Sequence, residues 1–225
     1  MEASQDLVTL IALTLGLGWA SGINLYAAIF MLGYLSLSGQ MVLPPGLEML
    51  AEPQVMWAAG FMYCVEFFAD KIPGVDTGWD AIHGFIRIPA GVVLAAAAMS
   101  DVGMPAQIAA GLIGGSLASG SYLTKAGGRV LINTSPEPFS NWVASVAEDV
   151  IVIVGLWTAL SHPGLFLVLM LMMVMLFIWL LPKIWRGIAK VFVTIKKWLG
   201  FTVQQKDDLN AISLSSQNDK DKSPD

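Results

Sequence analysis

Long apolar stretches, separated by short polar segments, run through residues 1–182 of the chain. A helix needs roughly 20 mostly apolar residues to cross a bilayer. Six stretches come near that length, at about 7–35, 54–70, 77–99, 106–124, 140–160 and 165–181. The pattern predicts an all-α integral membrane protein whose transmembrane domain, residues 1–182, contains about six transmembrane helices.

Two of the predicted spans are irregular. Ser21, Gly22 and Asn24 interrupt the first one. In the third, the purely apolar part at 88–99 has only 12 residues, which is too short to cross a bilayer. Either this helix includes the polar stretch at 79–87, or the region re-enters the membrane. The sequence leaves both alternatives open.

The chain changes character after Pro182. Apolar side chains fall on one face of a helix predicted over 183–202, and basic side chains fall on the other face. Such a helix lies on the membrane surface and is attracted to anionic lipids, which we expect residues 183–200 to bind. The tail at 203–225 is polar and mixed in charge, and we predict that it is disordered in the cytoplasm.

The basic residues determine the predicted orientation. All twelve Lys and Arg residues fall on one side of the six-span arrangement, and the loops at 36–54, 100–105 and 161–164 contain none. Bacterial membrane proteins keep basic loops in the cytoplasm. We therefore predict a multi-pass protein of the bacterial inner membrane with both termini in the cytoplasm. The apolar stretch at 7–37 is too long for the core of a signal peptide, so we interpret it as a retained first span.

Short motifs recur in the same order in two parts of the chain. The tripeptide Ala-Ser-Gly at 20–22 recurs at 118–120, and Glu-Pro followed by Trp at 52–57 recurs at 137–142. These matches predict two halves of three spans each, inverted relative to one another, as in many transporters that bind their substrate between such repeats. The halves would cover about 8–99 and 106–181. Chance matches are the alternative, because the spacing between motifs drifts.

Ionisable and polar side chains interrupt the predicted spans. Residues four apart share a helix face, as Glu66 does with Asp70 and Lys125 does with Arg129. Ionisable groups inside a membrane are costly, and they usually face the interior of the bundle and mark a path for an ion or substrate. The candidate substrate- or ion-binding residues are Asn24, Glu66, Asp70, Asp76, Asp80, His83, Arg87, Lys125, Arg129, Glu148 and Asp149.

The alternative to a binding site is a lattice of ion pairs that only holds the helices together. Arg87 on the third span would then pair with a carboxylate of the second span, Glu66 or Asp70. The basic residues of the fourth span would pair with Glu148 or Asp149 on the fifth. In such a lattice the charges compensate one another and bind no ligand.

The composition narrows the classes of function. Apolar residues make up 56% of the chain and charged residues 13%, well below the roughly 25% of charged residues in soluble proteins. The sequence has one cysteine, Cys64, and it contains no motif for a bound metal, a nucleotide phosphate or a catalytic nucleophile. We therefore predict no cofactor, no metal, no catalytic residues and no nucleic-acid partner.

Several of the polar segments resemble a known family. They lie at 20–26, 66–76, 79–83, 85–91, 133–141 and 148–149. Over about 15–190, the chain resembles the bacterial multi-pass membrane-protein family named domain of unknown function 4126. The resemblance implies a bacterial membrane protein in which these polar segments are important, and it implies no particular activity or substrate.

The sequence favours a transporter or channel-like protein for an ion or small solute. Glu66 and Glu148 would bind a cation or proton, and Arg87 would act as a counter-ion or as an anion clamp. One alternative is a membrane lipid-binding or lipid-processing protein with a headgroup site within residues 70–87. Another is a non-catalytic subunit or scaffold of a membrane complex. Whether the protein forms a homo-oligomer is left open.

Overall fold

The structure, a computed structural model, describes residues 2–72, 74–132 and 138–179. In chain order its elements are α1 (Glu2–Leu37), the 3-10 helix η1 (Pro45–Ala51), α2 (Pro53–Ala69), α3 (Val75–Ala98), α4 (Met104–Ile132), α5 (Pro138–Ser161) and a helix over Pro163–Trp179. The described residues contain no strand, so the predicted all-α class is confirmed. The chain divides into two units, 1–169 and 170–225, and α1 to α5 all belong to the first.

Three helices are long and apolar enough to cross a membrane. They cover Asp6–Leu37, Gly78–Ala98 and Phe139–Ser161, whereas the helix Pro163–Trp179 is apolar but shorter. α2 has 17 residues, and α4 has 29 residues but a sequence rich in Gly and Ser. Length and composition thus indicate a membrane protein. The predicted surface helix at 183–202 and the tail at 203–225 lie outside the described residues.

The distribution of side chains in the first unit also indicates a lipid environment. Large apolar side chains on α2 to α5 face outward, among them Phe61, Phe85, Leu112 and Trp157, each at least half exposed. Charged side chains such as Glu66 lie in the interior instead. Water favours the opposite arrangement, whereas lipid favours this one because a charge facing hydrocarbon is expensive.

α3 decides one alternative that the sequence leaves open. It is a single helix of 24 residues that begins at Val75 and continues through Pro89 to Ala98. The polar stretch at 79–87 is therefore part of the helix, and residues 75–98 contain no re-entrant break. With its polar part included, the helix is long enough to cross.

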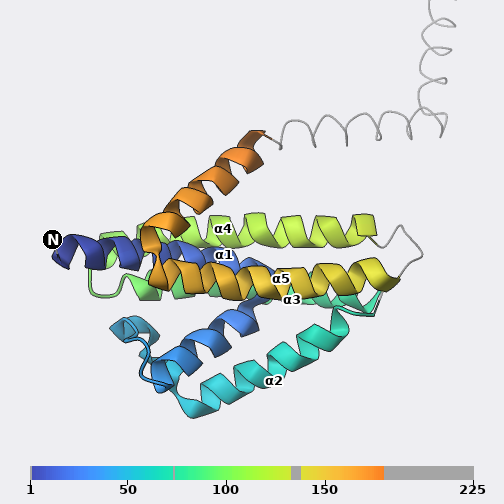
Figure 1. Ribbon diagram of the computed structural model, residues 1–225, viewed down its shortest axis with the longest axis horizontal. Helices are drawn as coiled ribbons and strands as arrows, with labels where there is room; N and C mark the ends of the chain where they lie inside the picture. The colour runs from blue at the N-terminus through green and yellow to red at the C-terminus, as the bar shows by residue number, and fades with distance from the viewer. Residues whose placement is uncertain (1, 73, 133–137, 180–225) are drawn as a thin grey trace, which may run out of the picture. The chain divides into compact units, whose positions relative to one another are not determined.

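α1 instead contains the break, and Asn24 alone has non-helical dihedral angles there (φ −146°, ψ 93°). Its side-chain Oδ1 accepts a hydrogen bond from the backbone N–H of Ala27 at 2.9 Å. This is the conformation and the bond of a helix N-cap. Asn24 therefore ends the segment 2–23 and starts the segment 25–37, and the two segments point in clearly different directions (Figure 1). Ser21 and Gly22, which we predicted to share the interruption, remain helical.

The first segment of α1 runs parallel to α4 and antiparallel to α5. Gly18 packs against Gly114 and Gly22 against Ala118, so residue numbers rise in the same direction along α1 and α4. On α5 the order is reversed, because Gly16 packs near Ala159 whereas Asn24 bonds Asp149. The N-terminal end of α1 therefore lies at the end of the bundle where α4 begins and α5 ends (Figure 1).

The second segment of α1 returns to that same end. It runs antiparallel to α2, with Phe30 packed against Gly60 and Gly33 against Met56. The chain then passes through η1, where the backbone N–H of Gly46 donates to Ser100 Oγ, just beyond α3, at 3.0 Å. We predicted that residues 7–35 form the first of six spans. Residues 6–37 are long and apolar enough for a span, but the helix changes direction at Asn24, because the side chain of Asn24 caps a new helix there.

The two Ala-Ser-Gly motifs meet where α1 and α4 pack together. Ser121 Oγ, which follows the second motif, donates a hydrogen bond to the carbonyl of Trp19 at 2.8 Å. Inverted repeats would place the two motif-bearing helices in opposite directions, but here they run in the same direction. The inverted arrangement predicted from the motifs is therefore wrong for this pair of helices, and the small residues instead let the two backbones approach closely.

This close approach predicts that Gly22→Ala is destabilising. The added methyl group would collide with the carbonyl oxygen of Ala118 and the hydroxyl of Ser121, and such overpacking typically costs about 1–3 kcal/mol. Thermal unfolding of the purified protein measures the loss. Gly120→Ala is the matched control from the second motif, because nothing lies within 4 Å of its added methyl group and alanine favours a helix. Equal melting temperatures for the two variants would contradict the packing described.

Candidate functional site

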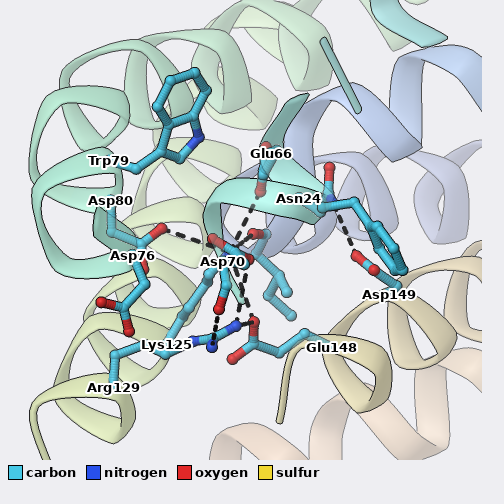
Figure 2. Close-up of polar contacts among 12 residues, drawn as sticks. Asn24, Glu66, Asp70, Asp76, Trp79, Asp80, Lys125, Arg129, Glu148 and Asp149 are labelled. Carbon is cyan, nitrogen blue, oxygen red and sulfur yellow. Dashed lines mark hydrogen bonds and ion pairs between the residues drawn. The ribbon is translucent and has the colours of Figure 1, made fainter. Parts of the chain in front are cut away.

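The candidate site lies around the turn of α1, where the other four helices also converge (Figure 2). α2 contributes its C-terminal end, α3 its first half, α4 its last third and α5 its middle. Nearly all the candidate side chains are buried, and Glu148, at 20% exposure of the side chain, is the most accessible member of the ion-pair network. The structure thus gathers residues that are up to 125 positions apart in the chain.

Arg87 joins α3 to α2. Its guanidinium donates to Glu66 Oε1 at 2.6 Å and to Asp80 Oδ1 at 2.8 Å. All three side chains are almost completely removed from solvent. Asp80 lies two helical turns before Arg87 on the same helix, so the side chain extends along α3 as well as across to α2. A buried guanidinium needs such partners, because an unpaired charge in the interior is strongly destabilising.

Lys125 lies at the centre of the network. Its Nζ donates to Asp70 Oδ2 at 2.9 Å and to Glu66 Oε1 at 3.3 Å. It also donates to the backbone carbonyl of Ile23 at 3.2 Å, directly before the break at Asn24. The carbonyls at the end of a helix segment lack helical partners and carry partial negative charge. The break in α1 therefore provides one of the acceptors that stabilise the lysine.

Arg129 joins α4 to α5 and to the end of α2. Its guanidinium donates to Glu148 Oε2 at 2.7 Å and to Asp70 Oδ2 at 3.3 Å. It also donates to the carbonyl of Asn141 at 3.3 Å, and the Asn141 amide in turn donates to Asp76 Oδ2 at 3.2 Å. Asp76 Oδ1 accepts from the N–H of Gly74 at 2.7 Å. The short turn between α2 and α3 is in this way tied to the ion pairs.

Asp149 forms a separate contact beside the cluster (Figure 2). Its Oδ1 accepts a hydrogen bond from Asn24 Nδ2 at 2.9 Å. Asn24 therefore uses both ends of its amide, one to cap the second segment of α1 and one to hold α5. Asp149 reinforces the turn of α1 from the neighbouring helix.

His83 lies at an aromatic edge of the site. Its ring stacks on Trp79 with centroids 4.0 Å apart and meets the edge of Tyr26 at 5.9 Å. Its Nδ1 lies 2.9 Å from the carbonyl of Trp79. Trp79 and Tyr26 fall within segments that resemble the family, and neither was a candidate site residue. His83 packs against the network rather than forming one of its ion pairs.

The predicted pairings were partly correct. Arg87 pairs with Glu66 as predicted, and its second partner is Asp80 rather than Asp70. Both basic residues of α4 reach Glu148 as predicted. Asp149 contacts Asn24 instead. Asn141 and the carbonyl of Ile23 were not candidates, and a backbone oxygen gives no signal in a sequence.

The ion pairs leave an excess of negative charge. Three cations face four carboxylates, those of Glu66, Asp70, Asp80 and Glu148. Three of these carboxylates also keep one buried oxygen with no hydrogen-bond partner in the described part of the chain, namely Glu66 Oε2, Asp70 Oδ1 and Asp80 Oδ2. Buried polar atoms normally have partners. The cluster therefore has the capacity to bind an additional positively charged or hydrogen-bonding group.

Lys71 lies in the connection between α2 and α3, next to the cluster. Its ammonium lies over the ring of Phe67 and donates to the carbonyl of that residue at 3.0 Å. Partial burial lowers the pKa of Lys71, whereas the neighbouring carboxylates of Asp149 and Asp70 oppose that shift. Lys71 is thus held by the ring and the carbonyl of Phe67.

Comparison with known proteins identifies the family. Residues 11–183 match the family described as Domain of unknown function (DUF4126). The chain belongs to this family. No curated protein and no solved structure matches it. The resemblance expected from the polar segments is therefore confirmed, and the matched range includes every residue of the site described above.

The ion-pair network predicts a thermodynamic coupling between Glu66 and Arg87. Removing one member of a buried pair typically costs about 3–5 kcal/mol, because it leaves the other charge uncompensated. We expect Glu66→Gln and Arg87→Gln each to lower the melting temperature, and the double variant to lose clearly less than the sum of the two.

Thermal unfolding of the three purified variants measures this coupling. Asp101→Asn is the control, since Asp101 is exposed in the α3–α4 connection and surface changes usually stay within about 0.5 kcal/mol. Strictly additive losses would show that the two charges do not compensate each other.

Proposed function

We propose that this protein is a membrane transporter or channel-like protein for an ion or small solute, and that its buried carboxylates line the path. The observation that carries the proposal is the position of the network at the turn of a broken helix. Ionisable residues inside a membrane usually face a substrate or ion path. Backbone that is not helical at membrane depth is tolerated only inside protein or beside a water-filled cavity.

The depth of the network supports this function over a lipid-headgroup site. Glu148 lies ten residues from the start of α5, or about 15 Å along the helix at a rise of about 1.5 Å per residue. The hydrocarbon core of a bilayer is about 30 Å thick. A headgroup site within residues 70–87 would keep its charges near the end of the bundle, whereas this network continues inward to the turn of α1.

The excess of carboxylates supports a path over a scaffold. A lattice whose only role is to hold helices together is most stable when every charge and every buried oxygen has a partner. The network here has one more carboxylate than cations, and three of its buried oxygens lack partners in the described residues. The extra carboxylate favours binding of a cation, while Arg87 Nε and Arg129 Nε also lack partners in the described residues.

We also propose a revised topology. The twelve basic residues begin at Lys71, and the stretch before it carries acidic residues such as Glu2 and Asp6. If α1 enters and returns, the chain crosses five times, through α2 to α5 and a helix that includes 163–179. The basic connections at 70–74 and 133–137 and the C-terminus then face the cytoplasm of a bacterial inner membrane, and the N-terminus lies outside. This topology differs from the cytoplasmic N-terminus that the charge pattern alone predicts, because the turn at Asn24 removes one crossing.

The location of the N-terminus tests this topology. We expect an epitope at the N-terminus to be accessible from the periplasm in intact cells. Reporter fusions after Pro45 and Asp101 should also be external, and those after Asp76 and Pro136 cytoplasmic. The five-crossing and six-crossing topologies place these four positions on the same sides of the membrane, so only the N-terminus distinguishes them. A cytoplasmic N-terminus together with these four results would restore the six-span arrangement.

Ion flux into vesicles tests the function. Purified protein in proteoliposomes should dissipate gradients of protons, sodium, potassium or ammonium faster than protein-free vesicles. Glu148→Gln should reduce this flux by about tenfold or more, which corresponds to about 1.4 kcal/mol in the barrier, because Glu148 is the most accessible carboxylate of the network. Glu48→Gln in exposed η1 is the control. Flux equal to that of empty vesicles for all four ions would refute the proposal.

A further inference from the structure

We propose that the ammonium of Lys125 occupies a binding site for a monovalent cation, and that potassium or ammonium is the ligand class that this site accepts. The inference names the ligand of the proposed path and so rests on that function. Its test detects cation binding through thermal stability and needs no transport measurement. In the native protein the side chain of Lys125 acts as a tethered cation that fills the site.

The first argument is the oxygen shell around Nζ of Lys125. Five oxygens lie near it, one from α1 and four from carboxylates at α2, α3 and α5, while the lysine itself belongs to α4. Figure 2 shows these carboxylates around Lys125. The five oxygens are Asp70 Oδ2 at 2.9 Å, Ile23 O at 3.2 Å, Glu66 Oε1 at 3.3 Å, Asp80 Oδ1 at 3.5 Å and Glu148 Oε2 at 3.6 Å. An ammonium has three N–H donors, fewer than the oxygens present. Proteins replace the hydration shell of a monovalent cation with several oxygen atoms arranged around it.

The second argument is the size of the shell. Magnesium binds oxygen at about 2.0–2.1 Å and calcium at about 2.3–2.6 Å. The oxygens here stand 2.9–3.6 Å from the charge at the centre. Within the described ranges, no group of three or more His, Cys, Asp or Glu side chains is arranged to hold a metal ion directly. The oxygens therefore stand at the distances of an ammonium group, too far from its centre for a small divalent ion.

The third argument is charge. Without the ammonium of Lys125, the two guanidiniums of Arg87 and Arg129 would face four carboxylates. Glu66, Asp70 and Asp80 also retain their unpartnered buried oxygens. So much uncompensated charge is costly inside a protein. A free cation that takes the place of the ammonium would restore the balance, and the break in α1 supplies the backbone oxygen of the shell.

Replacing the lysine tests the site. Lys125→Ala removes the ammonium and leaves room for an ion, whereas Lys125→Met fills the same space with an apolar chain. The thermal unfolding of each purified full-length variant is measured at constant ionic strength in potassium chloride, ammonium chloride or N-methylglucamine chloride. We expect the alanine variant to melt at a lower temperature than the wild type in N-methylglucamine. Potassium or ammonium should restore most of that loss in a saturable manner, because a ligand that binds only the folded state stabilises it.

The methionine variant and the wild type are the matched controls, and their melting temperatures should not depend on which cation is present. Equal melting temperatures of Lys125→Ala in all three salts would overturn the inference, as would an equal response of Lys125→Met. If Lys125→Ala alone does not fold, Lys125→Ala combined with Asp70→Asn carries one negative charge fewer and should also show a cation-specific rise, a smaller one because Asp70 supplies the nearest oxygen. Failure of both to fold in potassium or ammonium also overturns the inference, since the bound ion is expected to stabilise them.

These results separate the site from the proposed function. Cation-specific rescue without any ion flux in vesicles would retain the site and refute the transport function. Ion flux without rescue would retain the function and refute this site as the place where the cation binds.

Discussion

The structure depends on how a single ammonium group is accommodated inside a membrane protein. Lys125 comes from α4, and its acceptors come from the other four helices of the first unit. A charge in the interior is tolerated only when its surroundings compensate it. The positions of α1, α2, α3 and α5 around this residue therefore follow from one requirement, that each helix bring an oxygen to the same point.

The break in α1 is part of the same requirement. An unbroken helix would use the carbonyl of Ile23 for its own hydrogen bonds, and that oxygen would be unavailable to Lys125. Asn24 frees it, and its side chain then caps the following segment and binds Asp149. One residue thus ends a helix, starts another and fastens both to α5. At the break, the N–H of Ala27 bonds the side chain of Asn24 instead of the carbonyl of Ile23. This change of partner lets α1 turn back toward its starting end.

Small residues make the arrangement sterically feasible. Gly18 and Gly22 allow α1 to approach the backbone of α4, and this close packing brings the end of the first segment within reach of Lys125. In lipid, packing between backbones replaces much of the hydrophobic driving force that water supplies. The polar network and the glycine contacts therefore support one another, because the ion pairs need close helices and the close helices need small side chains.

The sequence by itself determined the helical class, the apolar lipid-facing character and the identity of the charged residues in the interior. These properties depend on composition and on spacing along one helix, as for Glu66 and Asp70, which are local. The tertiary structure decided which charged and polar groups meet, because Lys125 pairs with Asp70 and Asn24 bonds Asp149 through packing between distant segments. It also decided the path of α1, since an apolar stretch of this length looks the same in sequence whether it crosses or returns. The decisive feature there is one capping bond, from Ala27 to Asn24, and hydropathy does not register it because a single polar residue hardly changes the average of a long apolar run.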